Sequence, residues 1–119
     1  MGFSISSREA EGIPVLDLSG DSSIRDGAVL QQTVRGLMDQ GKRYFILNLE
    51  GVRYLDSFGL GQIVATYQSV RSVNGDMRII NPNDKVKALL RYTRIDGVVH
   101  VVRSESDAIE ELRNLTSSQ

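Results

Sequence analysis

The residues in this sequence whose types and spacing most strongly suggest a functional site lie in a short polar junction. Residues 56–61, DSFGLG, separate an apolar run from a stripe of apolar residues with helical spacing. An Asp or Ser at that point is a common helix N-cap, so either Asp56 or Ser57 fits that role. The cap does not explain Gly59 and Gly61, since each glycine weakens a helix by roughly 0.5–1 kcal/mol relative to alanine. A closely approaching partner or a phosphate group would favour the bare backbone.

Ser57 is therefore the candidate for a charge-dependent switch. A phosphate on its hydroxyl would add about −1.5 to −2 charges beside Asp56. The free amides and the positive dipole end of the helix start would hold that group locally, so the fold could tolerate it. A partner pressed against Phe58 and Leu60 would lose affinity, because it would have to desolvate the dianion.

The elements that must position this junction follow from the spacing of apolar residues. The N-terminal residues 3–18 predict a hairpin that turns at Glu11-Gly12. The alternation that follows is typical of an α/β sheet whose later strands run parallel. The predicted elements after the hairpin are a helix at 27–40, a buried strand at 44–50, a helix with its stripe at 60–70, a strand at 76–81, a helix at 83–93, a strand at 98–102 and a helix at 104–115.

Two loops are predicted to meet at one edge of this sheet. Right-handed crossovers bring the loop GDSSIRDG, residues 20–27, next to the junction at 55–61. Ligands and partners of open α/β sheets usually dock at this carboxyl edge of the strands. The junction and its neighbouring loop are thus expected to form one surface.

Composition limits the other possibilities. The 119 residues, 40% of them hydrophobic, predict a single domain over 1–119, with residues 115–119 expected to fray. A net charge of −1 with scattered basic residues argues against direct nucleic-acid binding. The chain has no cysteine and only one histidine, His100, so we expect no disulfide, no metal site and no cofactor. No run approaches the roughly 20 apolar residues that span a bilayer, so we expect a cytoplasmic protein without membrane insertion.

The junction and its surroundings resemble a known family. The run VRYLDSFGLGQIV, residues 52–64, is similar to the signature of STAS domains, in which Asp-Ser is followed by Ser or Thr and then by Gly-Leu-Gly. The resemblance extends to LSGD at 18–21, to KVKALLRYTRIDGVVHVV at 85–102 and to SESDAIEEL at 104–112. It implies an α/β STAS-like mixed sheet, with an N-terminal antiparallel hairpin followed by parallel strands alternating with helices.

The resemblance to the anti-sigma factor antagonists of this family implies a function. In them an anti-sigma factor that is also a serine kinase phosphorylates the serine after the aspartate, here Ser57. The unphosphorylated antagonist, which is not an enzyme, captures that kinase and frees a sigma factor, until phosphorylation breaks the complex and a phosphatase resets it. Phe58 departs from the pattern, because it replaces a small hydroxyl residue; it could be a binding anchor or indicate a different kinase or none. The implied partner-binding residues are Asp21, Ser22, Ser23, Asp56, Phe58, Gly59, Leu60 and Gly61.

Two enzymatic or ligand-binding alternatives have weaker support. Ser57 could be a nucleophile with Asp96 and His100, but Leu55 stands where a nucleophile elbow needs its first glycine. His100 within VVHVV is more simply a half-buried strand residue. Nucleotide binding would use the glycines at the helix start, yet neither Gly-x-x-x-x-Gly-Lys-Ser/Thr nor Gly-x-Gly-x-x-Gly occurs.

A third alternative keeps the fold and changes the regulation. STAS domains also occur as constitutive subunits of lipid-transport ATPases and of stress-sensing complexes, where phosphorylation of Ser57 would not control binding. The sequence leaves the oligomeric state open, including a homodimer. The remaining charges, such as Arg91, Arg94 and Arg103, are predicted to be solvated and receive no role.

Overall fold

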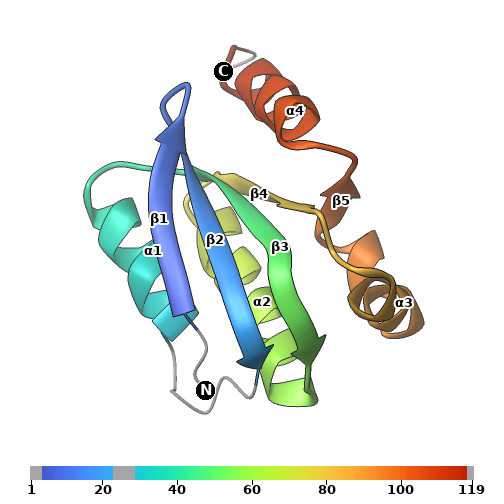
Figure 1. The fold of residues 1–119 in the computed structure, drawn as a ribbon. Coiled ribbons are helices and arrows are strands. Elements are labelled where there is room, and N and C mark those ends of the chain that lie inside the picture. The colour runs from blue at the N-terminus through green and yellow to red at the C-terminus, as the bar shows by residue number, and fades with distance from the viewer. Residues whose placement is uncertain (1–3, 23–28, 118–119) are drawn as a thin grey trace.

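The computed structural model describes residues 4–22 and 29–117 and shows one mixed β-sheet with helices on both faces (Figure 1). The five strands lie in sequence order, β1-β2-β3-β4-β5, with β1 antiparallel to β2 and every later neighbour parallel. The predicted α/β class and its mixed sheet are therefore confirmed. The strands are β1 Ser4–Ala10, β2 Ile13–Ser22, β3 Tyr44–Leu55, β4 Asp76–Ile80 and β5 His100–Val102, and the helices are α1 Val29–Asp39, α2 Ser57–Arg71, α3 Asp84–Tyr92, η2 Ile95–Gly97 and α4 Glu105–Ser117.

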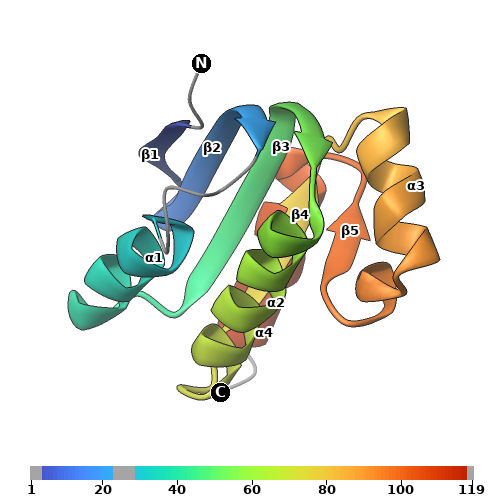
Figure 2. The ribbon, with the colours of Figure 1, turned by 90° about the horizontal axis from the view of Figure 1, so that it is seen from below.

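The helices divide between the two faces of the sheet, as Figure 2 shows. Side chains alternate along β3, so that Phe45 and Leu47 pack in the larger core with α1, α2 and α3. Ile46 points to the other face and packs against Ile109 and Leu112 of α4. This double coverage explains why β3 reads as a continuous apolar run.

β3 is longer than the sequence pattern predicted. The expected strand at 44–50 continues to Leu55, because β2 also extends, to Ser22, and pairs with it up to the Ser22–Leu55 position. Val52 and Leu55 are buried, which anchors the extension in the core. The strands approach closely at Gly51, where a Cβ would lie 2.7 Å from the Cβ of Ser19.

The C-terminal segment also differs from the expectation. β5 begins at His100 rather than at 98, because the 3₁₀ turn η2 directs the backbone N–H groups of Val98 and Val99 to the carbonyl of Ile95. α4 continues through Ser117, so the tail expected to fray from 115 is helical over its first three residues. Leu115 packs against the smaller core and stabilises this last turn.

A buried cation attaches α4 to the sheet. Arg78 on β4 is buried, and its Nε donates to Glu111 Oε1 of α4 at 2.7 Å, while its Nη1 lies 3.2 Å from Asp76. Burial alone would lower the pKa of Arg78, but the hydrogen bond to Glu111 and the charge of Asp76 outweigh burial and raise it. No helix in the described part of the chain is both long and apolar enough to cross a bilayer.

Candidate functional site

Asp56 forms the N-cap of α2 and decides the local geometry of the site. Its backbone is extended, with φ −93° and ψ 179°, and its Oδ1 accepts a hydrogen bond from the backbone N–H of Gly59 at 2.8 Å. Its carbonyl accepts the N–H of Leu60 at 3.0 Å. The ambiguity between Asp56 and Ser57 is thus resolved in favour of Asp56 as the cap.

Ser57 is consequently the first residue of α2, and it is exposed to solvent. A group attached to its hydroxyl would stand at the positive end of a 15-residue helix. The Asp56 carboxylate already accepts the hydrogen bond from the Gly59 N–H. A phosphate on Ser57 would therefore be placed next to this carboxylate at the start of α2. The arrangement leaves Ser57 accessible without making it necessary for the cap.

Two exposed aromatic side chains are close to this serine in the sequence. Phe58 is 46% exposed and Tyr54, near the end of β3, is 57% exposed. Beside Tyr54 lies a groove of about 270 Å³ between the end of β3 and α3, lined by Tyr54, Leu55, Lys85, Val86 and Leu89. Exposed aromatic residues next to an apolar groove are typical of protein-binding surfaces.

The glycines and Leu60 of the junction occupy different environments. Gly61 is exposed, and a Cβ added there would meet no atom within 4 Å, so packing within the described chain does not require a glycine. Gly59 is buried, and Leu60 packs into the larger core with only 7% exposure. Leu60 was expected to contact a partner, but its side chain anchors α2 and presents little surface.

Residues 20–22 of the predicted loop belong to β2 instead, because they pair with the end of β3 beside the junction. The parallel register places Asp21 opposite Tyr54 and Ser22 opposite Leu55. Ser23 lies outside the described residues. The two chain segments therefore leave the sheet side by side at the same edge.

Asn83 supports the site, although the sequence analysis gave it no role. Its Oδ1 accepts the N–H of Val86 at 2.8 Å and caps α3, while its Nδ2 donates to the carbonyls of Val52 and Arg53 at 3.1 and 3.3 Å. One side chain thereby joins the start of α3 to the end of β3. An Asn before Asp84 and an apolar stripe is a sequence pattern that predicts a helix N-cap. The hydrogen bonds from Asn83 to β3 could be found only in the tertiary structure.

The predicted alternative triad is not assembled. The register aligns His100 on β5 with Arg78 on β4 and Arg78 with Ile46 on β3. Ile46 precedes the end of β3 at Leu55 by nine residues, which separates His100 from Ser57 by roughly 30 Å along the strand direction. His100 is also exposed rather than half-buried.

The main network of charged side chains lies away from Ser57 and joins β1, β2 and the start of α4. Arg8 on β1 bridges Asp17 at 2.7 Å and Glu105 at 2.6 Å, and Asn48 donates to Asp17 at 2.8 Å. The hydrogen bond from Arg8 holds the pKa of Asp17 and that of Glu105 below their ordinary values. This network joins the hairpin to the start of α4.

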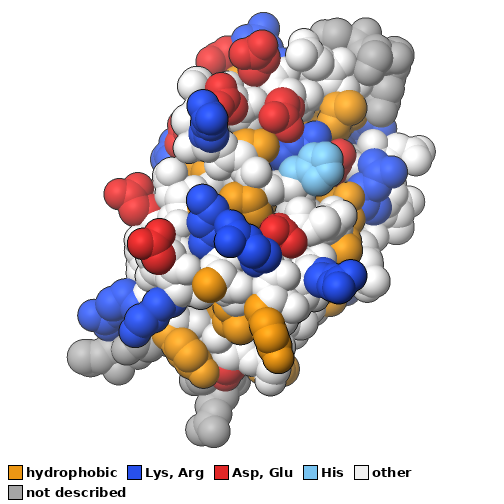
Figure 3. Space-filling view, turned by 90° about the vertical axis from the view of Figure 1, so that its right-hand side faces the viewer, with side chains coloured by type: hydrophobic (Ala, Val, Ile, Leu, Met, Phe, Trp, Pro, Cys, Tyr) orange, Lys and Arg blue, Asp and Glu red, His pale blue; other side chains and the backbone are white. Residues whose placement is uncertain are grey.

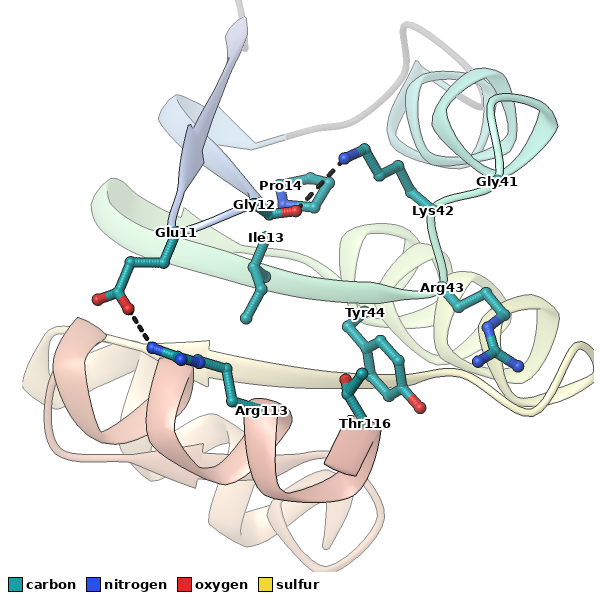
Figure 4. Close-up of a pocket in the computed structure, with 10 residues that line it drawn as sticks. All are labelled: Glu11, Gly12, Ile13, Pro14, Gly41, Lys42, Arg43, Tyr44, Arg113 and Thr116. Carbon is teal, nitrogen blue, oxygen red and sulfur yellow. Dashed lines mark hydrogen bonds and ion pairs between the residues drawn. The ribbon is translucent and has the colours of Figure 1, made fainter. Parts of the chain in front are cut away.

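A cavity of about 430 Å³ lies at the opposite end of β3 from Ser57 (Figure 4). An ion pair between Arg113 and Glu11 closes one side, and Lys42 donates to the carbonyl of Gly12 at 3.4 Å on the other. The hydroxyl of Tyr44 is buried there without a hydrogen-bond partner among the described residues. Within residues 4–22 and 29–117, no cluster of His, Asp or Glu is placed to hold a metal ion.

The mixed sheet and the exposed serine at the start of α2 define a class of small α/β domains. The candidate site in this class is a protein-binding surface around that serine. Residues 4–108 match the STAS domain family, and the chain belongs to it. A Thermotoga maritima protein named as a candidate anti-sigma factor antagonist is 36% identical over 76 residues, which cover 64% of this chain and 67% of that protein. The resemblance of the junction is thus confirmed at the level of the family.

Two further comparisons agree with this membership. The anti-sigma-B factor antagonist of Staphylococcus aureus is 24% identical over 101 residues, which cover 85% of this chain and 94% of that protein. The crystal structure of the candidate antagonist from Thermotoga maritima matches with a TM-score of 0.79 and 26% identity, covering 92% of this chain and 94% of that one.

Proposed function

We propose that this protein is an anti-sigma factor antagonist whose binding to its partner is controlled by phosphorylation of Ser57. The proposal rests on one observation above all: Ser57 is exposed at the first position of α2, beside a cap that does not depend on it. Membership in the STAS domain family and relatives named as anti-sigma factor antagonists support the same function. The partner is an anti-sigma factor that is also a serine kinase, and a separate phosphatase restores the unmodified form.

The switch works through the cost of burying charge. In the unmodified protein Ser57 is uncharged and exposed, and the exposed aromatic side chains of Phe58 and Tyr54 are near it in the sequence, so a partner can cover this surface without burying a charge there. Phosphorylation would place a dianion at the centre of that contact, where desolvation is unfavourable. The fold itself survives, because the N-cap bond from Gly59 to Asp56 does not involve the serine.

The test begins with the tagged protein, purified from its host together with the proteins that bind it. The captured kinase and ATP should add one phosphate to the wild-type chain, detected by intact mass, and none to Ser57→Ala. Ser57→Asp should lose binding by about tenfold or more, whereas Ser106→Asp should not. Ser106 is the matched control because it is an exposed serine in the first turn of α4.

Two outcomes would contradict the proposal. If Ser57→Asp binds its partner as tightly as the wild type, the protein is a constitutive subunit of a larger complex. If phosphate is added at another residue, Ser57 is not the switch. Phe58→Ala and Tyr54→Ala should each weaken binding by more than about 1 kcal/mol without changing thermal stability, since both side chains are exposed anchors.

A further inference from the structure

A basic groove runs along the edge of the sheet, on the side of α3 away from Tyr54. We define the basic groove by two adjoining cavities of about 260 and 240 Å³, which share Lys87, Val101, Val102 and Arg103. Arg91 extends it along α3. Figure 3 shows Lys and Arg side chains clustered in the middle of this face, with hydrophobic and acidic side chains beside them. From the sequence alone, Arg91 and Arg103 are predicted to be solvated charges without a role.

The charges of the basic groove are not explained by contacts within the described chain. Lys87 and Arg91 stand one turn apart on α3, and like charges at that spacing destabilise a helix. Arg103 joins them from the end of β5, and Asp96 is the one acid that lines the same cavities. Three cations converge here in a chain whose net charge is −1. An anionic partner would offset this repulsion.

The edge strand beside these cations favours an extended peptide segment, rather than a small compact anion, as the ligand of the basic groove. β5 is the last strand of the sheet and pairs with β4 on one side only. Val101 and Val102 are half-buried and line both cavities, with Val101 packed against the larger core and Val102 against the smaller one. A sheet edge can accept a peptide as an added strand through main-chain hydrogen bonds, with side-chain pockets providing specificity. Two cavities in a row also suit a chain of residues better than a single phosphate.

We infer that the basic groove binds an acidic, extended segment of a partner protein, which adds to β5 as a strand and places its carboxylates against Lys87, Arg91 and Arg103. This site is separate from the junction at Ser57, because α3 lies between them: Val86 and Leu89 face Tyr54, whereas Lys87 and Arg91 face β5. Its function therefore does not depend on phosphorylation of Ser57.

The test is an amide-shift titration of the ¹⁵N-labelled protein with a capped peptide in which Glu and Val alternate. The expected shifts concentrate at residues 87–91 and 100–103, and raising the salt concentration weakens binding. The double variant Lys87→Glu/Arg91→Glu should lose affinity by about tenfold or more. Arg35→Glu, an exposed arginine of α1 outside the groove, is the matched control and should bind like the wild type.

Three further probes separate this proposal from its rivals. A peptide with Pro at its central position should bind much more weakly, because proline cannot complete a strand; equal binding would overturn strand addition. Inorganic phosphate that reproduces the same shifts would make the groove a small-anion site and overturn the proposal. Single-stranded DNA that binds more tightly than the peptide would also overturn it. Ser57→Asp should leave the titration unchanged, which keeps this result independent of the switch.

Discussion

Removal of the Asp56 cap is the perturbation with the most clearly defined consequence. Asp56→Ala removes one hydrogen bond, from the Gly59 N–H to Oδ1 at 2.8 Å, and keeps the backbone bond from Leu60 to the Asp56 carbonyl. Loss of an N-cap side chain costs about 0.5–2 kcal/mol, typically about 1. Loss of the negative charge at the helix start adds about 0.3–1 kcal/mol. We expect a total loss of about 1–2 kcal/mol in the free energy of unfolding.

Asp56→Asn separates the two contributions. Asparagine keeps an oxygen that can accept from Gly59 but carries no charge, so its loss should stay within about 1 kcal/mol. Equilibrium urea unfolding measures both variants, and each kcal/mol should lower the melting temperature by about 3–5 °C in a domain of this size. Asp39→Ala, at the exposed end of α1, is the control and should remain within about 0.5 kcal/mol of the wild type.

Removal of the Asp56 cap should also have a local effect at the start of α2, distinct from a loss of global stability. In Asp56→Ala the amide hydrogen of Gly59 should exchange faster under native conditions, while amides in the last turns of α2 should change little. If Asp56→Ala and Asp56→Asn are equally destabilised, or if exchange at Gly59 is unchanged, the side-chain cap does not hold the site in the way described.

Three other predictions concern stability, all measured by urea unfolding. Gly75→Ala should be strongly destabilising, because its Cβ would lie 2.0 Å from the backbone carbonyl oxygen of Arg43, just before β3; wild-type stability would refute this contact. Gly61→Ala should instead stabilise the helix by up to about 1 kcal/mol, since its Cβ meets nothing within 4 Å, and a loss would reveal a hidden clash. Arg8 lowers the pKa values of Asp17 and Glu105 below 3.8 and 4.5, so their stabilisation is present above about pH 5 and is lost as the pH falls through the lowered values. Arg8→Met should flatten that loss between about pH 5 and pH 3, and an unchanged slope would exclude the network as its source.

Local sequence patterns were sufficient for the element order and for the position of the junction. The predicted turn at Glu11-Gly12 is present, with positive φ values of 52° and 83°; the glycine adopts such a value without strain, whereas it is uncommon for Glu11. Of the predicted stripe on α2, Leu60, Ile63 and Val70 are buried, while Val64 and Tyr67 are half-buried against the same core. These features depend on neighbours within a few residues, so their spacing along the chain carries the information.

The sequence patterns were less reliable at predicting which side chains are exposed enough to contact a partner. Leu60 belongs to the same motif as Phe58, yet one is buried and the other is exposed, because the helix turns them to different faces. The length of β3 and the hydrogen bonds from Asn83 to the carbonyls of Val52 and Arg53 depend on contacts with distant segments. No local window contains those partners.

The sequence by itself determined the α/β alternation, the hairpin and a polar junction at the start of a helix, because each follows from short-range periodicity and turn chemistry. Only the tertiary structure decided that Asp56 caps the helix while Ser57 stays exposed, and that Lys87 and Arg91 meet Arg103 beside an edge strand. Which side chains face solvent, core or one another is set by how distant elements pack, and packing joins residues that the chain keeps far apart.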